Sequence, residues 1–350
     1  MMNKRKIRIQ CLLAFATLLF YSCQKKEGYT AELLDCDKIQ YLKSEIINDS
    51  FVFASPKAIL SYDSLLIVVD TRLNDSAFHL FRKSDGGFIQ SGGRKGEGPG
   101  ELLMPGTPFI SQRGVLSFWD MYKSKVVEYD LKEIATGGKE TYFSEYPIKK
   151  EDTFTSYLEV VPLSAGRYLY NGNTHKHLGI MGSDSYVICP VLPEITSEEE
   201  RWAVMNYSKM ALSPDRKHLV QATYIGGVVR GFDIKDNKVK ERFLHLYFKP
   251  RYELVDGAKP TCIKWCDESR MGFESVCATN KCIYLLLNGK EARERPFANE
   301  ILVMDWKGHI IRKMKLDRTV KAIAVDEAAN TIYAISTGFS TEPSLLLFKM

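Results

Sequence analysis

The chain has 350 residues, of which 45% are hydrophobic and 26% are charged, and its formal net charge is +5 at pH 7. Most of the positive excess comes from the first 22 residues, which hold four of the 48 basic residues and none of the 43 acidic ones. The rest of the chain is therefore close to neutral, with basic and acidic residues interleaved. Because this distribution offers no basic surface for phosphates, we exclude nucleic acid as a partner.

The N-terminus predicts an export signal followed by a lipid anchor. Four basic residues precede an apolar run over 11–20, and the small residue Ser22 stands just before Cys23. The run is too short to span a bilayer, which takes about 20 residues. Residues 18–23, Leu-Leu-Phe-Tyr-Ser-Cys, resemble a bacterial lipobox, in which the cysteine is acylated. We therefore expect a lipoprotein signal peptide over 1–22 and a lipidated tether over 23–37; the alternative is an ordinary signal peptide cleaved near Ser22.

After residue 38 the sequence repeats one strand-rich unit. Each unit has an apolar strand, a polar loop and a second strand that ends at an aromatic residue or a methionine. These ends are 48, 52, 51, 72 and 44 residues apart, a period typical of propeller blades with one enlarged unit. The six predicted strand pairs are 65–70 with 77–81, 115–120 with 125–129, 167–170 with 178–181, 218–223 with 228–232, 282–287 with 301–304, and 331–335 with 345–348.

The pattern predicts an all-β fold, a six-bladed β-propeller over 38–350. The last unit stops after its third strand, so we expect the alternating segment 38–47 to supply the missing strand and close the ring. A helix is expected after Ser197, which precedes three glutamates. A pair of β-sandwiches is the alternative fold, but it does not explain the regular period. Hairpin turns with residues that accept positive φ are expected at 84–87, 136–138, 235–237 and 307–308.

A glycine-rich segment carries the resemblance to a known family. It reads Gly93-x-x-Gly96-x-Gly98-Pro99-Gly100-Glu101-Leu102-x-x-Pro105-Gly106, and the strands 115–120 and 125–130 follow it. This pattern resembles the NHL-type propeller repeat. Together with the lipobox it is similar to the six-bladed propeller lipoproteins of the Bacteroides type described as TolB-like. The resemblance implies a propeller in the cell envelope but no single activity, because the related families include binding modules, peptide lyases and sugar-lactone hydrolases.

The same glycines could form a nest of backbone N–H groups for phosphate. However, the segment lacks the Gly-Lys-Ser/Thr ending of a phosphate-binding loop, and no helix start follows it. We therefore interpret it as the connection from the outer strand of one blade to the inner strand of the next.

One face of the predicted propeller is the expected ligand site, because the loops between second and third strands gather there with the connections between blades. Mixed charged, amide and aromatic groups on this face suit a polar ligand such as a glycan or a peptide. The carboxylates at strand ends could instead simply accept backbone N–H groups. The candidate ligand-binding residues are Asp70, Arg72, Arg94, Lys95, Asp120, Tyr122, Asn171, His175, His177 and Asn288, with Tyr224, Arg293 and Arg295 further round the ring.

The sequence identifies no catalytic residue, and no cofactor is predicted. His175 and His177 could join carboxylates of other blades to hold zinc, and calcium could bind oxygen ligands from several blades. Cys262 and Cys266 lie on one side of the enlarged unit and Cys277 and Cys282 on the other, where a disulfide would persist after export.

Together these features favour a membrane-anchored, non-catalytic binding or scaffold module in the outer membrane, on its periplasmic or surface face. Its expected partners are outer-membrane lipid, through the acyl anchor, and a glycan, a peptide or an envelope protein. The alternative is a metal-dependent hydrolase or lyase of the lactonase kind, with calcium or zinc in the funnel of the propeller.

Overall fold

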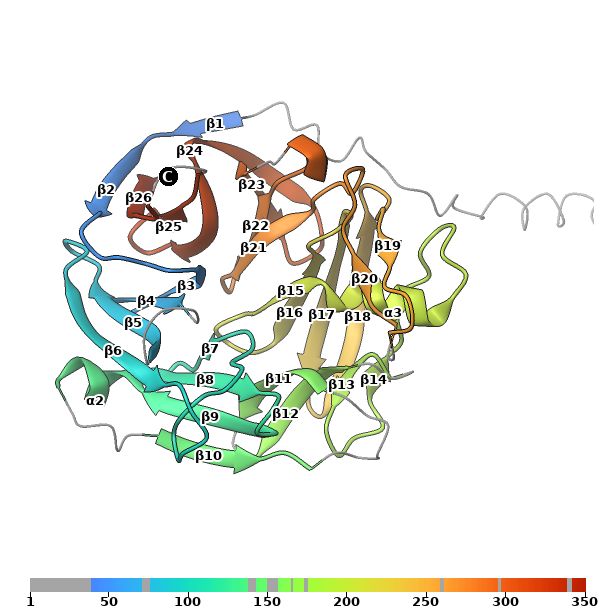
Figure 1. The fold of residues 1–350 in the computed structure, drawn as a ribbon, viewed down its shortest axis with the longest axis horizontal. Helices are drawn as coiled ribbons and strands as arrows, with labels where there is room; N and C mark the ends of the chain where they lie inside the picture. The colour runs from blue at the N-terminus through green and yellow to red at the C-terminus, as the bar shows by residue number, and fades with distance from the viewer. Residues whose placement is uncertain are drawn as a thin grey trace, which may run out of the picture.

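The chain forms a ring of β-sheets around a central axis (Figure 1). A computed structural model describes residues 39–70, 76–137, 143–149, 157–164, 166–172, 176–258, 261–294, 297–338 and 342–350. The predicted signal peptide and tether, with Cys23, lie outside these residues, as do Arg72 and His175. In the part of the chain that is described, no helix has the length and apolar character needed to cross a membrane.

Four blades are separate antiparallel sheets of four strands, and in each the chain passes from one edge strand to the other in sequence order. Blade 1 contains β3 (Pro56–Tyr62), β4 (Leu65–Asp70), β5 (Ser76–Arg82) and β6 (Phe88–Arg94). Blade 2 contains β7 (Phe109–Ile110), β8 (Val115–Asp120), β9 (Lys125–Asp130) and β10 (Phe143–Pro147). Blade 3 contains β11 (Tyr157–Ser164), β12 (Arg167–Gly172), β13 (Leu178–Ile180) and β14 (Tyr186–Val187). Blade 4 contains β15 (Ser208–Leu212), β16 (His218–Thr223), β17 (Val228–Lys235) and β18 (Lys238–Leu246).

The last two blades share one long strand, β24 (Ile310–Asp326). Its first part pairs with β23 and completes blade 5, whereas its second part, from Val320 onward, pairs with β25 and begins blade 6. The other strands of these blades are β21 (Phe273–Ala278), β22 (Cys282–Leu287) and β23 (Ala298–Asp305) in blade 5, and β25 (Thr331–Ser336) and β26 (Leu345–Lys349) in blade 6. All six predicted strand pairs are confirmed, and the fold is the predicted all-β, six-bladed propeller.

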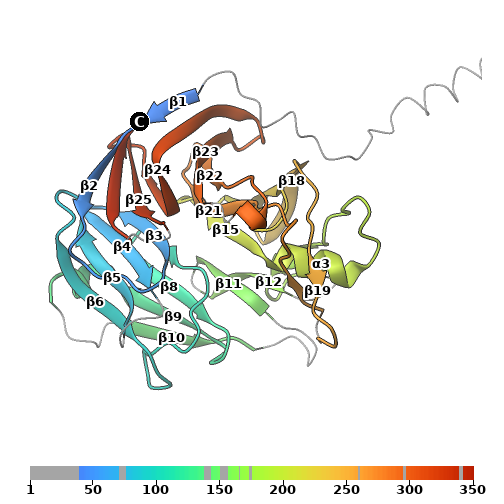
Figure 2. The ribbon, with the colours of Figure 1, turned by 45° about the horizontal axis from the view of Figure 1, so that its top comes forward.

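The N-terminal strands close the ring, as the sequence predicted. β2 (Ser44–Asn48) pairs antiparallel with β26 and gives blade 6 its fourth strand. β1 (Ile39–Leu42) pairs in parallel with the first part of β24, at the outer edge of blade 5. The two ends of the described chain therefore lie side by side, the N-terminal strands against the C-terminal blade (Figure 2). This pairing covers the strand edges that would otherwise be exposed.

The hydrophobic core is divided among the junctions between neighbouring blades. Phe78 and Leu80 of blade 1 pack with Phe118 and Tyr129 of blade 2. Corresponding groups of buried residues join blades 2 and 3, 3 and 4, 4 and 5, and 5 and 6. A further group joins blade 6 back to blade 1. Because each core is shared by two blades, a blade keeps its apolar faces buried only while the ring is closed.

The glycine-rich segment connects blades 1 and 2, which confirms its structural interpretation. The Glu101 carboxylate accepts the N–H of Gly98, and the Glu145 carboxylate accepts the N–H of Gly100. Gly100 has a positive φ of 68°, and a Cβ there would meet the ring of Phe143 at 2.5 Å. Two of the backbone N–H groups that a phosphate would use are thus held by the protein's own carboxylates, and the N–H of Gly96 donates to the carbonyl of Leu102.

The turn expected at 136–138 is present in its described residues, 136–137, where Gly137 has a positive φ of 81°. A short helix, α2 (Leu131–Ala135), precedes this turn, because the Asp130 carboxylate caps the helix by accepting the N–H groups of Lys132 and Glu133. One local prediction needs correction. Cys266, Cys277 and Cys282 are free thiols, so the disulfide suggested for the enlarged unit is not formed among them. The predicted helix is confirmed as α3 (Glu198–Asn206), with the Ser197 hydroxyl accepting the N–H of Glu200.

Ring closure makes a prediction about two adjacent residues of β1. Leu42 is 4% exposed and belongs to the core between blades 5 and 6, whereas Tyr41 is 76% exposed. We expect Leu42→Ala to lower the free energy of unfolding by about 2 kcal/mol or more, as truncation of a buried leucine does. Tyr41→Ala should change it by less than about 0.5 kcal/mol. Urea unfolding measures both, and equal effects of the two variants would contradict a closing role for this strand.

Candidate ligand-binding site

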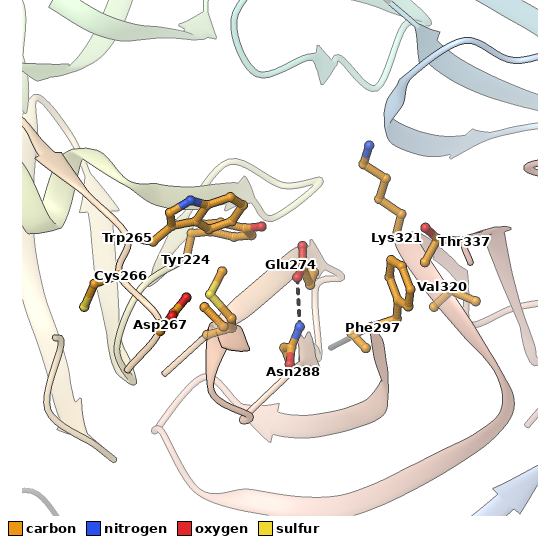
Figure 3. A pocket seen from close by; sticks show the side chains of 13 residues that line it. Tyr224, Trp265, Cys266, Asp267, Glu274, Asn288, Phe297, Val320, Lys321 and Thr337 are labelled. Atoms are coloured by element: carbon orange, nitrogen blue, oxygen red, sulfur yellow. Dashed lines mark hydrogen bonds between the residues drawn. The ribbon is translucent and has the colours of Figure 1, made fainter. Parts of the chain in front are cut away.

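A cavity of about 540 Å³ opens on the face where the loops between second and third strands gather (Figure 3). Its wall comes from the loops after β16, β22 and β25, in blades 4, 5 and 6, and from the connection between blades 4 and 5. We call this cavity the blade 4–6 pocket. The polar and aromatic side chains that line it are Tyr224, Trp265, Asp267, Glu274, Asn288, Phe297, Lys321 and Thr337.

The enlarged unit that the sequence predicted forms one wall of this pocket. It contains a small hairpin, β19 (Glu253–Leu254) with β20 (Ile263–Lys264), followed by Trp265. The Ser269 hydroxyl fixes the chain after the hairpin by accepting the N–H of Cys266. Trp265 is 56% exposed, and the centre of its ring system lies 6.4 Å from that of Tyr224. An exposed aromatic wall of this kind provides a surface on which a ligand can stack.

β-Bulges place charged residues at the start of inner strands. The register shifts by one residue between Phe273 and Ser275 in β21, which leaves Glu274 as the extra residue. The same shift occurs around Lys321 in β24 and around Lys57 in β3. A bulge redirects the side chain of the extra residue, and bulges are frequent beside functional sites. Glu274 and Lys321 both line the blade 4–6 pocket.

Glu274 lies at the centre of the pocket and is held by Asn288, whose side-chain amide donates a hydrogen bond of 3.0 Å to Oε1. Burial raises the pKa of Glu274, although this hydrogen bond and the charges of Lys209 and Lys321 oppose the shift. Burial lowers the pKa of Lys209, which comes from the inner strand of blade 4. The Lys209 ammonium lies 5.8 Å from the centre of the Tyr224 ring. Lys209 does not line the pocket itself, but its charge acts on Glu274. A displaced pKa at a cavity-lining carboxyl with a charged neighbour is typical of functional sites.

Lys321 stands on the other side of the pocket from Trp265 and Asp267 (Figure 3). Its side chain extends beside Phe297 and Thr337 toward open space. Among the residues that the structure describes, none forms an ion pair or a hydrogen bond with the Lys321 ammonium. The pocket therefore has the Asp267 carboxylate on one side, the Glu274 carboxyl group at its centre and the Lys321 ammonium on the other side.

Of the residues predicted from the sequence, Asn288 and Tyr224 line this pocket. Asp70 and Asp120 are fully buried and accept backbone N–H groups. Asp70 accepts those of Ala54 and Ser55, whereas Asp120 accepts those of Leu103, Met104, Tyr122 and Lys123. Both aspartates thus fix the connections that enter blades 1 and 2. This is the second role that the sequence analysis considered for them, in which a carboxylate at a strand end accepts backbone N–H groups.

The remaining predicted residues that are described lie elsewhere. Asn171 and His177 are buried where blade 3 meets blade 4, and His177 Nε2 lies 3.4 Å from the Gln221 amide. Burial, with the charge of Arg230, lowers the pKa of His177 to about 3. Arg94, Lys95 and Tyr122 are exposed on blades 1 and 2 and do not line the pocket. Within the described ranges, no three side chains of His, Cys, Asp or Glu gather closely enough to hold a metal ion.

The sequence-based set missed Trp265, Asp267, Glu274 and Lys321. Two signals pointed to them. The 72-residue spacing marked the enlarged unit that carries Trp265 and Asp267. A charged residue directly after an apolar one recurs where inner strands begin, at Phe273-Glu274 and Val320-Lys321.

A model of the TolB-like 6-blade propeller-like family matches residues 35–328. No curated protein sequence matches the chain significantly. Among solved structures, a member of the DUF4221 family from Bacteroides vulgatus has 11% sequence identity and a TM-score of 0.52, and the alignment covers 88% of this chain and 96% of that chain. At this identity the likeness shows the fold alone.

Two further solved structures have TM-scores below 0.5. A protein described as exported, from Bacteroides fragilis, has 12% identity and a TM-score of 0.47, covering 89% of this chain and 98% of that chain. A gluconolactonase from Xanthomonas campestris has 9% identity and a TM-score of 0.48, covering 88% of this chain and 89% of that chain.

The raised pKa of Glu274 makes a pH-dependent prediction. The folded chain holds a proton on this carboxyl more tightly than the unfolded chain, whose glutamate has the ordinary pKa of 4.5. The free energy of unfolding therefore falls as the pH rises from 4.5 through the raised pKa. Glu274→Gln keeps the oxygen that accepts from Asn288 and carries no charge. In urea unfolding, we expect the free energy of unfolding of Glu274→Gln minus that of the wild type to be larger at pH 8 than at pH 4. A difference that does not change with pH would contradict a raised pKa at Glu274.

Proposed function

The chain belongs to the TolB-like six-bladed propeller family, and from this premise we propose that it is a membrane-anchored, non-catalytic binding module. Its ligand is a polar molecule of the glycan or peptide class. The site is the blade 4–6 pocket, rather than the wider ring of residues that the sequence suggested.

The observation that carries this proposal is the composition of the pocket. Its volume of about 540 Å³ falls within the range of roughly 300–1,000 Å³ usual for small-molecule sites. Trp265, Tyr224 and Phe297 provide apolar walls, whereas Asn288, Glu274, Lys321 and Thr337 provide polar groups. Apolar walls with a few convergent polar groups are what a site needs to hold and orient a polar ligand.

The proposed location is the outer membrane, on its periplasmic or surface face, with an acyl anchor at Cys23 in the lipid. The basic, then apolar, then lipobox-like order of residues 1–23 supports it. An envelope protein is a second proposed partner, because an anchored propeller presents a broad face beside the membrane. Several acyl chains on one cysteine would hold the protein on the membrane far more firmly than one chain would.

The alternative is a metal-dependent hydrolase or lyase in the same funnel, with calcium or zinc. The displaced pKa values of Glu274 and Lys209 favour it, because such displacements also accompany acid–base catalysis. An enzyme of this kind would bind its ion in stoichiometric amount and would convert the ligand. Metal content and ligand recovery therefore distinguish the two functions.

We expect at least one compound from panels of soluble glycans and short peptides to raise the unfolding temperature of the full chain, because binding to the native state stabilises it. Trp265→Ala should weaken that binding about tenfold or more, since exposed tryptophans in binding sites are frequent hot spots. Tyr41→Ala, at an exposed aromatic residue on β1, is the matched control and should bind normally.

Two outcomes would overturn the proposed function. One is that neither panel contains a compound whose effect depends on Trp265. The other is that mass spectrometry of the chain, purified without chelator, finds one calcium or zinc ion per molecule and the bound compound is recovered cleaved.

The anchor is tested by metabolic labelling with an alkyne fatty acid in a bacterial host. The wild-type chain should incorporate the label, and Cys23→Ser should abolish it, because the cysteine thiol is the site of acylation. Cys11→Ser, in the apolar run of the signal, is the matched control and should still be labelled. Labelling of Cys23→Ser at the wild-type level would refute an anchor at this residue.

A further inference from the structure

We propose that the ligand of the blade 4–6 pocket is a zwitterion of the peptide class, with its ammonium group beside Trp265 and Asp267 and its carboxylate at Lys321. This inference rests on the proposed binding function and narrows its ligand from polar molecules in general to amino-acid derivatives and short peptides.

The cationic end of the ligand is assigned to the wall formed by the enlarged unit. The Trp265 side chain is 56% exposed in the pocket, and Asp267 follows it by two residues. In the described part of the chain, no group forms a hydrogen bond or an ion pair with the Asp267 carboxylate. An ammonium group is attracted both by the face of an indole ring and by a nearby carboxylate. An indole ring and a carboxylate on the same wall of the pocket therefore favour a positive charge over a neutral hydroxyl.

The middle of the ligand is assigned to Glu274. Its Oε1 accepts the hydrogen bond from Asn288, and no described group donates to its Oε2. A carboxylate oxygen accepts hydrogen bonds and donates none, so it pairs with an N–H or O–H group of the ligand. Backbone N–H groups of a peptide meet this requirement between its two charged ends.

The anionic end is assigned to Lys321, on the other side of the pocket. The bulge in β24 directs this lysine beside Phe297 and Thr337, and no ion pair joins it to Glu274. Its ammonium is thus available to a ligand carboxylate, and the Thr337 hydroxyl can donate a second hydrogen bond to the same group.

The cost of desolvation disfavours a neutral ligand in this arrangement. Any ligand that fills the pocket removes water from Glu274, Asp267 and Lys321. A charge that loses its water and gains no partner is strongly unfavourable, whereas a partner of opposite charge restores the lost interactions. A neutral glycan offers hydroxyl groups only, so it leaves Asp267 and Lys321 without a partner of opposite charge. A zwitterion offers an ammonium group to Asp267 and a carboxylate to Lys321 at the same time. Because these two residues lie on opposite sides of the pocket, they also fix the orientation of the ligand.

The test is affinity selection with mass spectrometry on the full chain. The probes are tripeptides with uncharged side chains, prepared with free termini, with an acetylated N-terminus, with an amidated C-terminus, and with both ends blocked. Neutral oligosaccharides of similar size form the fifth set. We expect tripeptides with free termini to be retained. Blocking either terminus should weaken binding about tenfold or more, because it removes one charge-assisted contact.

Matched variants then assign each end of the ligand. Lys321→Met should weaken binding of the free tripeptide about as much as C-terminal amidation does, and it should not weaken the amidated tripeptide further. Asp267→Asn should weaken binding of the free tripeptide about as much as N-terminal acetylation does, and it should not weaken binding of the acetylated tripeptide further. Lys307→Met, at an exposed lysine in the turn after β23, is the control and should bind like the wild type.

The outcomes separate this inference from the proposed function. Oligosaccharides or doubly blocked tripeptides that bind as tightly as free tripeptides, and depend on Trp265, would overturn the zwitterion and leave the binding function standing. Retention of no compound from any of the five sets would count against both. Additive effects of Lys321→Met and amidation would also overturn the assignment of the carboxylate to Lys321.

Discussion

The structure depends on the pairing of the N-terminal strands with the last two blades. β2 completes blade 6 and β1 extends blade 5, so the chain's two ends hold the ring together. Six hydrophobic clusters of the described chain each lie between two blades, and the cluster that joins blade 6 to blade 1 is complete only when the ring is closed. A closed ring in turn fixes the loops at the ends of its strands relative to one another. The ligand-binding pocket draws on loops of three blades, so its geometry is a consequence of this closure.

Within that frame, two local irregularities produce the candidate site. The enlarged connection between blades 4 and 5 adds an aromatic wall, and bulges in two inner strands turn Glu274 and Lys321 into the cavity. Burial raises the pKa of Glu274, although the hydrogen bond from Asn288 and the charges of Lys209 and Lys321 oppose this shift. Carboxyl groups with displaced pKa values are frequent in functional sites.

The repeat pattern was sufficient to predict the fold because the second and third strands are rich in apolar residues, as in 65–69, which are all apolar and buried. The closing strand followed from the missing outer strand of the last unit. The site was less predictable. Asp70 and Asp120 occur at strand ends whether they bind a ligand or cap the backbone, and only the structure shows the N–H groups they accept. A bulge depends on pairing between strands, so the sequence of one strand does not reveal it, and Glu274 was missed for that reason.

The central claim is that the blade 4–6 pocket binds a ligand without converting it. Hydrogen–deuterium exchange of the full chain tests this claim most directly. It is measured without a ligand and with the tightest-binding compound from the glycan and peptide panels. The account predicts slower exchange over 265–274, 288–294 and 320–322, with the compound recovered unchanged afterwards. Protection confined to blades 1 to 3, or recovery of a cleaved compound, would contradict it.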